Sequence, residues 1–161
     1  MNLATGAPSA RGAWARVAVV VASVLAADQL VKAIVIASLE RGDERALVAG
    51  IKLVHTRNTG VAFGQLQDGG AIITVIIAIA LCGLLAYFAR HIELPLIWLP
   101  TGMLLGGALG NIADRIRHGA VVDFVKLPHW PAFNVADTAI TVGVVILLFV
   151  MERGDRARAS S

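Results

Sequence analysis

Five acidic or amide side chains lie within a short stretch near the C-terminal end of an otherwise apolar chain. The stretch runs from residue 106 to residue 141, and the five side chains are Asn111, Asp114, Asp123, Asn134 and Asp137. Asp123 lies in a connecting segment, and the other four stand at the inner ends of two apolar runs. A charged side chain near hydrocarbon is costly and by default marks a functional site. This stretch is therefore the predicted active site.

Two of these carboxylates, Asp123 and Asp137, could form a catalytic pair. Asp137 stands in the first turn of a predicted helix, and a chain reversal around Pro128 and Pro131 could bring Asp123 close to it. Two carboxylates about 3 Å apart cannot both ionise, so one acts as a base toward water and the other as an acid toward a carbonyl. This arrangement is that of an aspartic peptidase, and it needs no metal and no cofactor.

Other chemistry stays open for the same residues. A metal site could be built from His118, Asp123 and His129, although their spacing matches no ligand motif. A small four-helix membrane carrier could instead use Asp28 and Asp137 as an intramembrane carboxylate relay. Asp123 discriminates the carrier from the peptidase, because a relay through the bilayer needs no carboxylate in a surface segment.

Two further pairs of charged residues favour structural roles. Asp28 and Lys32 are four residues apart, so they share one face of a helix and can form an ion pair that anchors the outer end of the first helix. Asp114 and Arg115 adjoin the predicted end of the third helix and can form a structural salt bridge.

The composition indicates a membrane protein. The chain has 161 residues, of which 57% are hydrophobic and 16% are charged, whereas a soluble domain has roughly 45–50% apolar and about 25% charged residues. Much of the net charge of +3 lies in tails and loops, and no basic run is interleaved with aromatic residues. This pattern favours contact with membrane lipids over nucleic acid. The single cysteine, Cys82, permits no intramolecular disulfide.

Four apolar segments predict a single membrane domain over residues 16–152. About 20 apolar residues cross a bilayer, and the predicted spans are about 17–37, 71–89, 95–113 and 135–151. Residues 1–15 are expected to be disordered, and the charged tail 153–161 is expected to be frayed. The first apolar run imitates a signal peptide, but its length and the lack of a small-residue cleavage site favour a retained helix.

Two longer segments, 38–70 and 114–134, connect the spans on one side of the membrane, because four spans place both termini on the other side. Alternating runs such as 51–55 predict two strands, which form a small β-sheet outside the hydrocarbon between the first and second helices. Asn58-Thr59-Gly60 predicts a turn. Gly106 and Gly110 predict close packing of another helix or of a ligand. Lysine and arginine are spread over both sides, so these charges do not decide the orientation.

Five motifs, in this order, resemble those of the lipoprotein signal peptidases, also called signal peptidase II, a family of bacterial membrane aspartic peptidases. The motifs are D-Q-x-x-K at 28–32, N-T-G-V-A-F-G at 58–64, G-G-A-x-G-N-x-x-D-R at 106–115, V-V-D-F at 121–124 and F-N-V-A-D-T at 133–138. The resemblance covers about residues 17–151 and agrees with the four-helix hydropathy profile.

The resemblance implies that Asp123 and Asp137 are the catalytic dyad. The implied substrate is a prolipoprotein whose lipobox cysteine carries a diacylglyceryl group, cut just before that cysteine. Further residues are implied to orient the substrate or the dyad: Asn58, Gly60, Asn111, Arg115 and Asn134. Three others are implied to support the fold: Asp28, Lys32 and Asp114.

The resemblance also implies a place in the bacterial cytoplasmic (inner) membrane, with cytoplasmic termini and an active site at the periplasmic face. The 38–70 segment would then be a cradle and lid over the substrate that helps to exclude water. Inhibition by the cyclic peptide globomycin is implied as well. We expect a monomer, because both aspartates lie in one chain.

Overall fold

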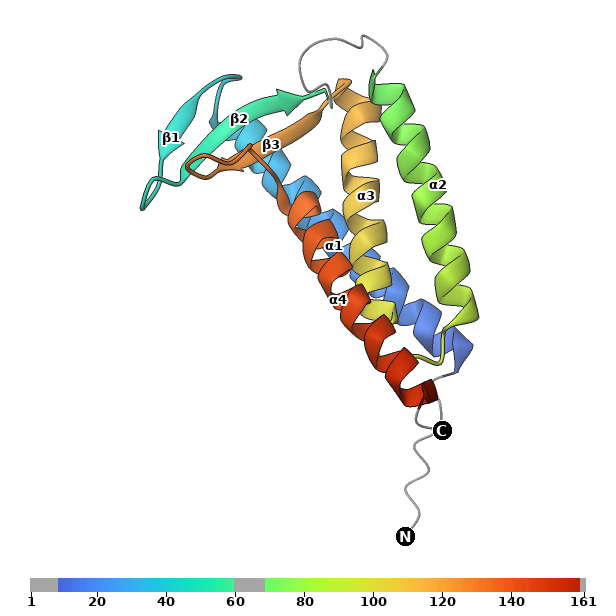
Figure 1. The fold of residues 1–161 in the computed structure, drawn as a ribbon. Coiled ribbons are helices and arrows are strands. Elements are labelled where there is room, and N and C mark those ends of the chain that lie inside the picture. Colours follow the sequence, from blue (N-terminus) through green and yellow to red (C-terminus); the bar gives the residue numbers. More distant parts are fainter. Residues whose placement is uncertain (1–8, 60–68, 160–161) are drawn as a thin grey trace.

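The computed structural model describes residues 9–59 and 69–159, and this part of the chain is mostly helical, with one small antiparallel sheet. Along the chain the elements are α1 (Ala10–Ser38), β1 (Glu44–Ala46), β2 (Lys52–Asn58), α2 (Gly69–Arg90), α3 (Trp98–His118), β3 (Val121–Lys126) and α4 (Val135–Ala159). The start of α1 and the end of α4 lie at one end of the molecule, and the sheet lies at the other (Figure 1). This placement is the one that an even number of spans requires.

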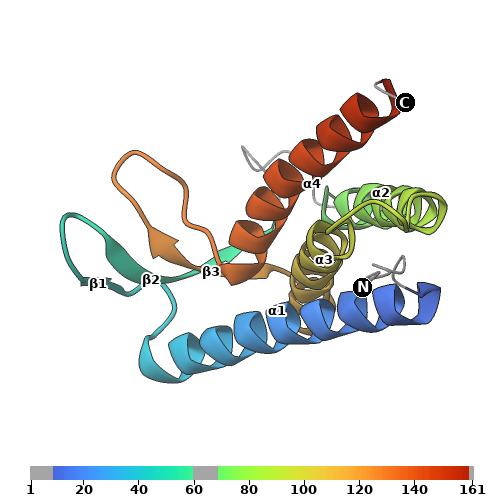
Figure 2. The same ribbon diagram turned by 90° about the horizontal axis from the view of Figure 1, so that it is seen from below.

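Helix α3 is the central helix and packs against α1, α2 and α4 (Figure 2). Its glycines allow this packing: a Cβ on Gly106 would lie 2.9 Å from the Cβ of Val24 on α1, and one on Gly107 would lie 2.5 Å from the carbonyl oxygen of Ala136 on α4. The close helix packing predicted for Gly106 is therefore confirmed. Within the described residues, the backbones of α2 and α4 do not approach each other closely.

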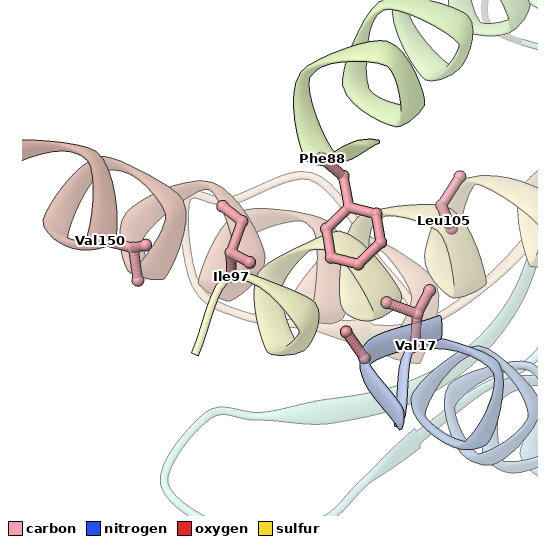
Figure 3. Close-up of a cluster of buried hydrophobic side chains, with 6 residues drawn as sticks. Val17, Phe88, Ile97, Leu105 and Val150 are labelled. Atoms are coloured by element: carbon pink, nitrogen blue, oxygen red, sulfur yellow. The ribbon is translucent and has the colours of Figure 1, made fainter. Parts of the chain in front are cut away.

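The main apolar cluster lies toward the end of the helices that holds the start of α1 and the end of α4. Figure 3 shows the fully buried ring of Phe88 on α2 among Val17, Ile97, Leu105 and Val150, which come from the other three helices and from the α2–α3 connection. Burial of such side chains contributes roughly 1.5–3 kcal/mol each. Most of the buried polar residues lie toward the opposite end of the helices, beside the sheet.

The prediction that residues 1–15 are disordered is wrong from Ala10 onward, where α1 begins. The Ser9 hydroxyl accepts a hydrogen bond from a backbone N–H of the first turn and so caps the helix. Trp14 then packs edge-on against Phe88, with ring centroids 4.7 Å apart. This aromatic contact with α2 orders a stretch that shows no hydrophobic periodicity of its own.

The third helix was predicted to end next to Asp114, and this is also wrong, because α3 continues to His118. The helix stops at Gly119, whose φ of 69° suits glycine. The extra turn places Asp114 and Arg115 on the helix instead of in the connecting segment. Asp114 then contacts Lys32 on α1, whereas Arg115 contacts the backbone of its own helix.

The tail predicted to be frayed from residue 153 is helical as far as Ala159, as part of α4. Two exposed ion pairs support it: Arg156 with Glu152 at 2.5 Å, and Arg158 with Glu93 at 3.3 Å. Exposed pairs of this kind add little each, so the main cause is continuation of an established helix.

The sheet has three strands in the order β1-β2-β3, and both neighbouring pairs are antiparallel. The two strands predicted within 38–70 are present as β1 and β2, whereas the third strand, β3, was predicted as part of a connecting segment. Its first four residues, Val121 to Phe124, are all buried, so the sequence lacks the alternation of a half-buried strand. The pairing aligns Thr56 of β2 with Asp123 of β3.

Two helices, α1 and α4, are long and apolar enough to cross a membrane. In α2 the part whose side chains are described forms a shorter apolar helix, residues 75–90. Helix α3 is less hydrophobic because it carries Asn111, Asp114 and several basic residues. The count of four spans stays a prediction.

Candidate active site

The structure brings four of the predicted site residues together: Asp123, Asp137, Asn111 and Asn134. The Nδ2 of Asn134 donates to Asp123 Oδ1 at 2.7 Å, and the Nδ2 of Asn111 donates to Asp137 Oδ1 at 2.8 Å. The two amides also contact each other, from Asn134 Nδ2 to Asn111 Oδ1 at 3.2 Å. A chain of hydrogen-bonded amides therefore links the two carboxylates.

The position of Asp137 follows from the way that α4 begins. The Oδ1 of Asn134 accepts a hydrogen bond from the Asp137 backbone N–H at 2.8 Å, and the Asn134 N–H donates to Asp137 Oδ2 at 3.3 Å. This reciprocal pair is the capping box of a helix N-terminus. The helix N-terminus also favours a negatively charged side chain. Asn134 therefore contacts both carboxylates: its side-chain amide donates to Asp123, and it caps the helix turn that carries Asp137.

Asp123 lies on β3 and is only 2% exposed. Its Oδ2 accepts a hydrogen bond from Asn58 Nδ2 at 3.1 Å, across the β2–β3 pair. Burial, with a smaller contribution from the charge of Asp137, raises the pKa of Asp123 from 3.8 to about 6, even though Asn58, Asn134 and Lys32 favour its ionised form. This carboxyl group can therefore hold a proton under conditions in which an exposed aspartate is ionised.

A second buried cluster lies directly behind the pair. Lys32 Nζ is 2.8 Å from Asp28 Oδ2, 2.8 Å from Asp114 Oδ2 and 3.2 Å from Asn111 Oδ1. The ion pair predicted between Asp28 and Lys32 is confirmed. The predicted alternative of a salt bridge from Asp114 to Arg115 is wrong, because the longer α3 turns Asp114 toward α1, where Lys32 neutralises it.

The two acidic groups of this cluster also bind the backbone beside the site. Asp28 Oδ1 accepts the Ala136 N–H at 2.9 Å, and Asp114 Oδ2 accepts the Val122 N–H at 3.0 Å. Ala136 and Val122 are the residues immediately before the two central carboxylates. Gln29 joins the cluster through its Nε2, 3.0 Å from Asp114 Oδ1. Gln29 stands in the D-Q-x-x-K motif, but no role was predicted for it.

Three other predicted residues lie less centrally or outside the described residues. Arg115 is half-buried; its Nη1 donates to the backbone of its own helix at 3.4 Å, and its buried Nε has no hydrogen-bond partner among residues 9–59 and 69–159. Asn58 reaches the pair through Asp123. Gly60 lies outside the described residues. In the same described ranges, no group of three His, Cys, Asp or Glu side chains could hold a metal ion, so His118, Asp123 and His129 do not form one.

Two mainly apolar cavities flank the pair. One, of about 250 Å³, lies between α2, α3 and α4; Ala80, Ala108 and Ile140 line it, and Asn111 stands at its polar end. The other, of about 290 Å³, lies between α4 and the segment that precedes it, and its lining includes Asp137 itself. An apolar ligand in the second cavity would contact Asp137 directly, and one in the first would contact its partner Asn111.

The apolar helices and the amide-linked carboxylates, one buried and one half-buried, together define a helical membrane protein with a candidate acid–base centre. A comparison with protein families gives its class: the family model described as Signal peptidase (SPase) II matches residues 20–152. The chain belongs to the signal peptidase II family. The resemblance predicted from the five motifs is thus confirmed, and with it a peptidase of a membrane-enzyme family.

Curated relatives and solved structures agree with this assignment. The lipoprotein signal peptidase of Thermodesulfovibrio yellowstonii is 38% identical over 130 residues, which cover 78% of this chain and 87% of that protein. The lipoprotein signal peptidase of Streptococcus pneumoniae is 37% identical over 140 residues, covering 84% and 91%. A solved structure of a bacterial membrane enzyme superposes with a TM-score of 0.78 at 28% identity, covering 84% of this chain and 91% of the other.

Proposed function

We propose that this chain is an aspartic endopeptidase that removes the signal peptide from diacylglyceryl-modified prolipoproteins, cutting just before the lipid-modified cysteine. The observation that carries the proposal is the arrangement of the buried Asp123 and the half-buried Asp137, joined through Asn111 and Asn134. The relatives named lipoprotein signal peptidase support the substrate class.

The proposed reaction uses the two carboxylates in different protonation states. Asp123, whose pKa burial raises to about 6, holds the proton and donates it to the oxygen of the scissile carbonyl. Asp137, at the helix N-terminus, takes a proton from water as the water oxygen attacks the carbonyl carbon. When the C–N bond breaks, the amine leaving group receives that proton from Asp137, and Asp123 recovers its proton from the hydroxyl of the tetrahedral intermediate. The reaction is complete without a metal or a covalent intermediate.

The surrounding residues are proposed to position these groups. Asn111 and Asn134 fix the carboxylate orientations, and the cluster of Asp28, Lys32 and Asp114 supports the fold beneath them. Three further groups are proposed to orient the substrate: Asn58, Gly60 and Arg115. For Arg115 the support is its buried Nε–H, which has no partner among the described residues and is a donor available to a bound peptide after a small movement.

The proposed topology has four spans, with the termini in the cytoplasm and the sheet end in the periplasm. The helices contain 29, 22, 21 and 25 residues, and a helix of about 20 residues crosses roughly 30 Å of hydrocarbon. Asn111 and Asp114 of α3 face other helices and the site instead of lipid, which makes a span of lower hydropathy acceptable. The 38–70 segment is proposed to cover the substrate as a cradle and lid.

The cavities beside the pair suit a substrate that is apolar on both sides of the scissile bond. The signal peptide precedes that bond, and the diacylglyceryl group is attached to the residue that follows it. The apolar cavity lined by Asp137 and the one that ends at Asn111 offer the two portions separate places that exclude water. A lipophilic cyclic peptide such as globomycin is expected to compete for the same surfaces.

The test is cleavage of a diacylglyceryl-modified prolipoprotein by the purified protein in detergent. Wild type is expected to cut before the modified cysteine, and Asp123→Asn and Asp137→Asn are each expected to lose at least about 10³-fold in rate. Thermal unfolding shows whether each variant is folded, and the same prolipoprotein without the lipid tests the substrate class. Substantial activity in either folded variant would contradict the dyad, and no cleavage by wild type would contradict the peptidase proposal.

A further inference from the structure

A cavity of about 440 Å³ lies far from the carboxylate pair, between the α2–α3 connection and the last turns of α4. Figure 1 shows this connection beside the C-terminal end of α4, at the end of the molecule opposite the sheet. The walls of the cavity are mostly apolar, and they include Leu94, Leu96, Val150 and Gly154. Three charged residues complete the lining: Glu93, Arg153 and Arg158.

The position along α4 places this cavity at a membrane surface. A helix rises about 1.5 Å per residue, so the distance from Val135 to Arg153 is roughly 27 Å, close to the roughly 30 Å of a hydrocarbon core. Since α4 starts at the surface that holds the active site, Arg153 lies at headgroup level on the other surface. Val150, one turn earlier, lies just inside the hydrocarbon. The cavity is therefore cationic at headgroup depth and apolar below it.

Of the two arginines that line the cavity, one has no counter-ion among the described residues. Arg158 pairs with Glu93 at 3.3 Å, and Arg156 pairs with Glu152 at 2.5 Å. Arg153 forms no ion pair with any residue in the described ranges 9–59 and 69–159, and its side chain lines the cavity. A guanidinium in this position is suited to a phosphate group, which it can bind through two parallel hydrogen bonds.

Two backbone features shape the wall of the cavity, at Leu96 and at Gly154. Leu96 has a φ of 64°, a left-handed conformation that is unfavourable for leucine, and it is 52% exposed as part of the wall. A Cβ on Gly154 would lie only 2.8 Å from Leu94 Cδ2. Strained positions of this kind often occur where a ligand is held.

We propose that this cavity binds an anionic phospholipid, with the headgroup phosphate on Arg153 and part of one acyl chain against Leu94, Leu96 and Val150. The bound lipid fills the space between the α2–α3 connection and α4, and so stabilises that end of the helical bundle. The proposal is independent of the peptidase chemistry, which takes place at the opposite membrane surface. It requires only that α4 spans the bilayer.

The test uses the full chain, delipidated in detergent, and measures thermal unfolding and native mass spectra with phosphatidylglycerol or phosphatidylcholine of matched acyl chains. Phosphatidylglycerol is expected to raise the midpoint and to be retained as one bound molecule, with at least about tenfold weaker retention in Arg153→Gln, because a lost charged contact is worth about 1.4 kcal/mol or more. Arg156→Gln is the matched control, since it removes one arginine of the same helix end that does not line the cavity.

A second variant tests the acyl-chain wall. Leu96→Asn places a residue that tolerates positive φ at this position, so the lipid-free protein is expected to keep its stability while the lipid binds more weakly. Three results would overturn the proposal: equal stabilisation by the two lipids, equal loss in Arg153→Gln and Arg156→Gln, or equal stabilisation by inorganic phosphate alone.

Discussion

Replacement of Asp123 by asparagine is expected to change the pH dependence of stability as well as activity. The folded protein raises the pKa of this carboxyl group from 3.8 to about 6, chiefly through burial. The folded state therefore binds the proton more tightly than the unfolded state. The stability linked to this proton is fully present below pH 3.8 and is lost as the pH rises through about 6. Asp123→Asn cannot ionise and does not show this loss.

The magnitude follows from the size of the shift. Each pKa unit corresponds to about 1.4 kcal/mol. With a shift of about two units, the wild type therefore loses roughly 3 kcal/mol of stability relative to the variant between acid and neutral pH. For a chain of this length, roughly 2–4 °C of midpoint accompanies each kcal/mol, which gives a relative shift of roughly 6–12 °C. The comparison within one variant across pH cancels any fixed cost of the altered hydrogen bonds to Asn58 and Asn134.

The assay is thermal unfolding in detergent from about pH 4 to about pH 7.5, with cleavage activity measured in parallel. Asp155→Asn, at the exposed end of α4, controls for the removal of one carboxylate elsewhere. We expect Asp123→Asn to be inactive and to become progressively more stable than the wild type as the pH rises. A midpoint difference that stays constant across this range would refute both the raised pKa and the assignment of the proton to Asp123.

Three further substitutions test the positions around the pair. Asn134→Ser keeps a good N-cap for α4 but removes the amide donor, so stability is expected to fall by only about 1 kcal/mol while cleavage falls roughly 10–100-fold; retained activity would contradict the amide's role. Lys32→Met leaves two buried carboxylates without a counter-ion and is expected to cost roughly 3–5 kcal/mol, measured by thermal unfolding. Ala80→Phe fills the cavity between α2, α3 and α4 and is expected to raise KM about tenfold with little change in kcat, whereas Ala78→Phe, exposed on the same helix outside the cavity lining, is expected to match the wild type.

The sequence predicts the helical elements well because they are long and apolar, but it does not predict where they end. Residue 113 is followed by a charged, helix-compatible run, and only the left-handed Gly119 stops α3. The early start of α1 depends on the contact of Trp14 with Phe88, which is 74 positions away along the chain and invisible to local periodicity. The third strand was missed because burial on both faces removes the alternating pattern.

The candidate site residues could be chosen from the sequence because charged and amide groups are costly near hydrocarbon and therefore uncommon in an apolar chain. Their partners were less predictable, since a neighbour in sequence is a poor guide on a helix. Asp114 adjoins Arg115 in sequence but bonds to Lys32 on α1. Asn134 was predicted as an orienting residue. Its contacts with both carboxylates depend on the cap geometry at the start of α4, which the sequence does not show.

The buried ion cluster positions the backbone next to the two proposed catalytic carboxylates. Three charges away from water are expensive, and a buried ion pair is weak evidence for added stability. Here, however, each carboxylate also accepts one backbone N–H: Asp28 that of Ala136, and Asp114 that of Val122. These two residues directly precede the proposed acid and base, so the first helix and the third helix together fix the relative placement of β3 and α4. Lys32 lies 2.8 Å from both carboxylates, and its contact with Asn111 extends the same network to the candidate site. Because the proposed reaction depends on the separation of two carboxylates from different elements, this arrangement accounts for a charged cluster at a depth where charge is otherwise avoided.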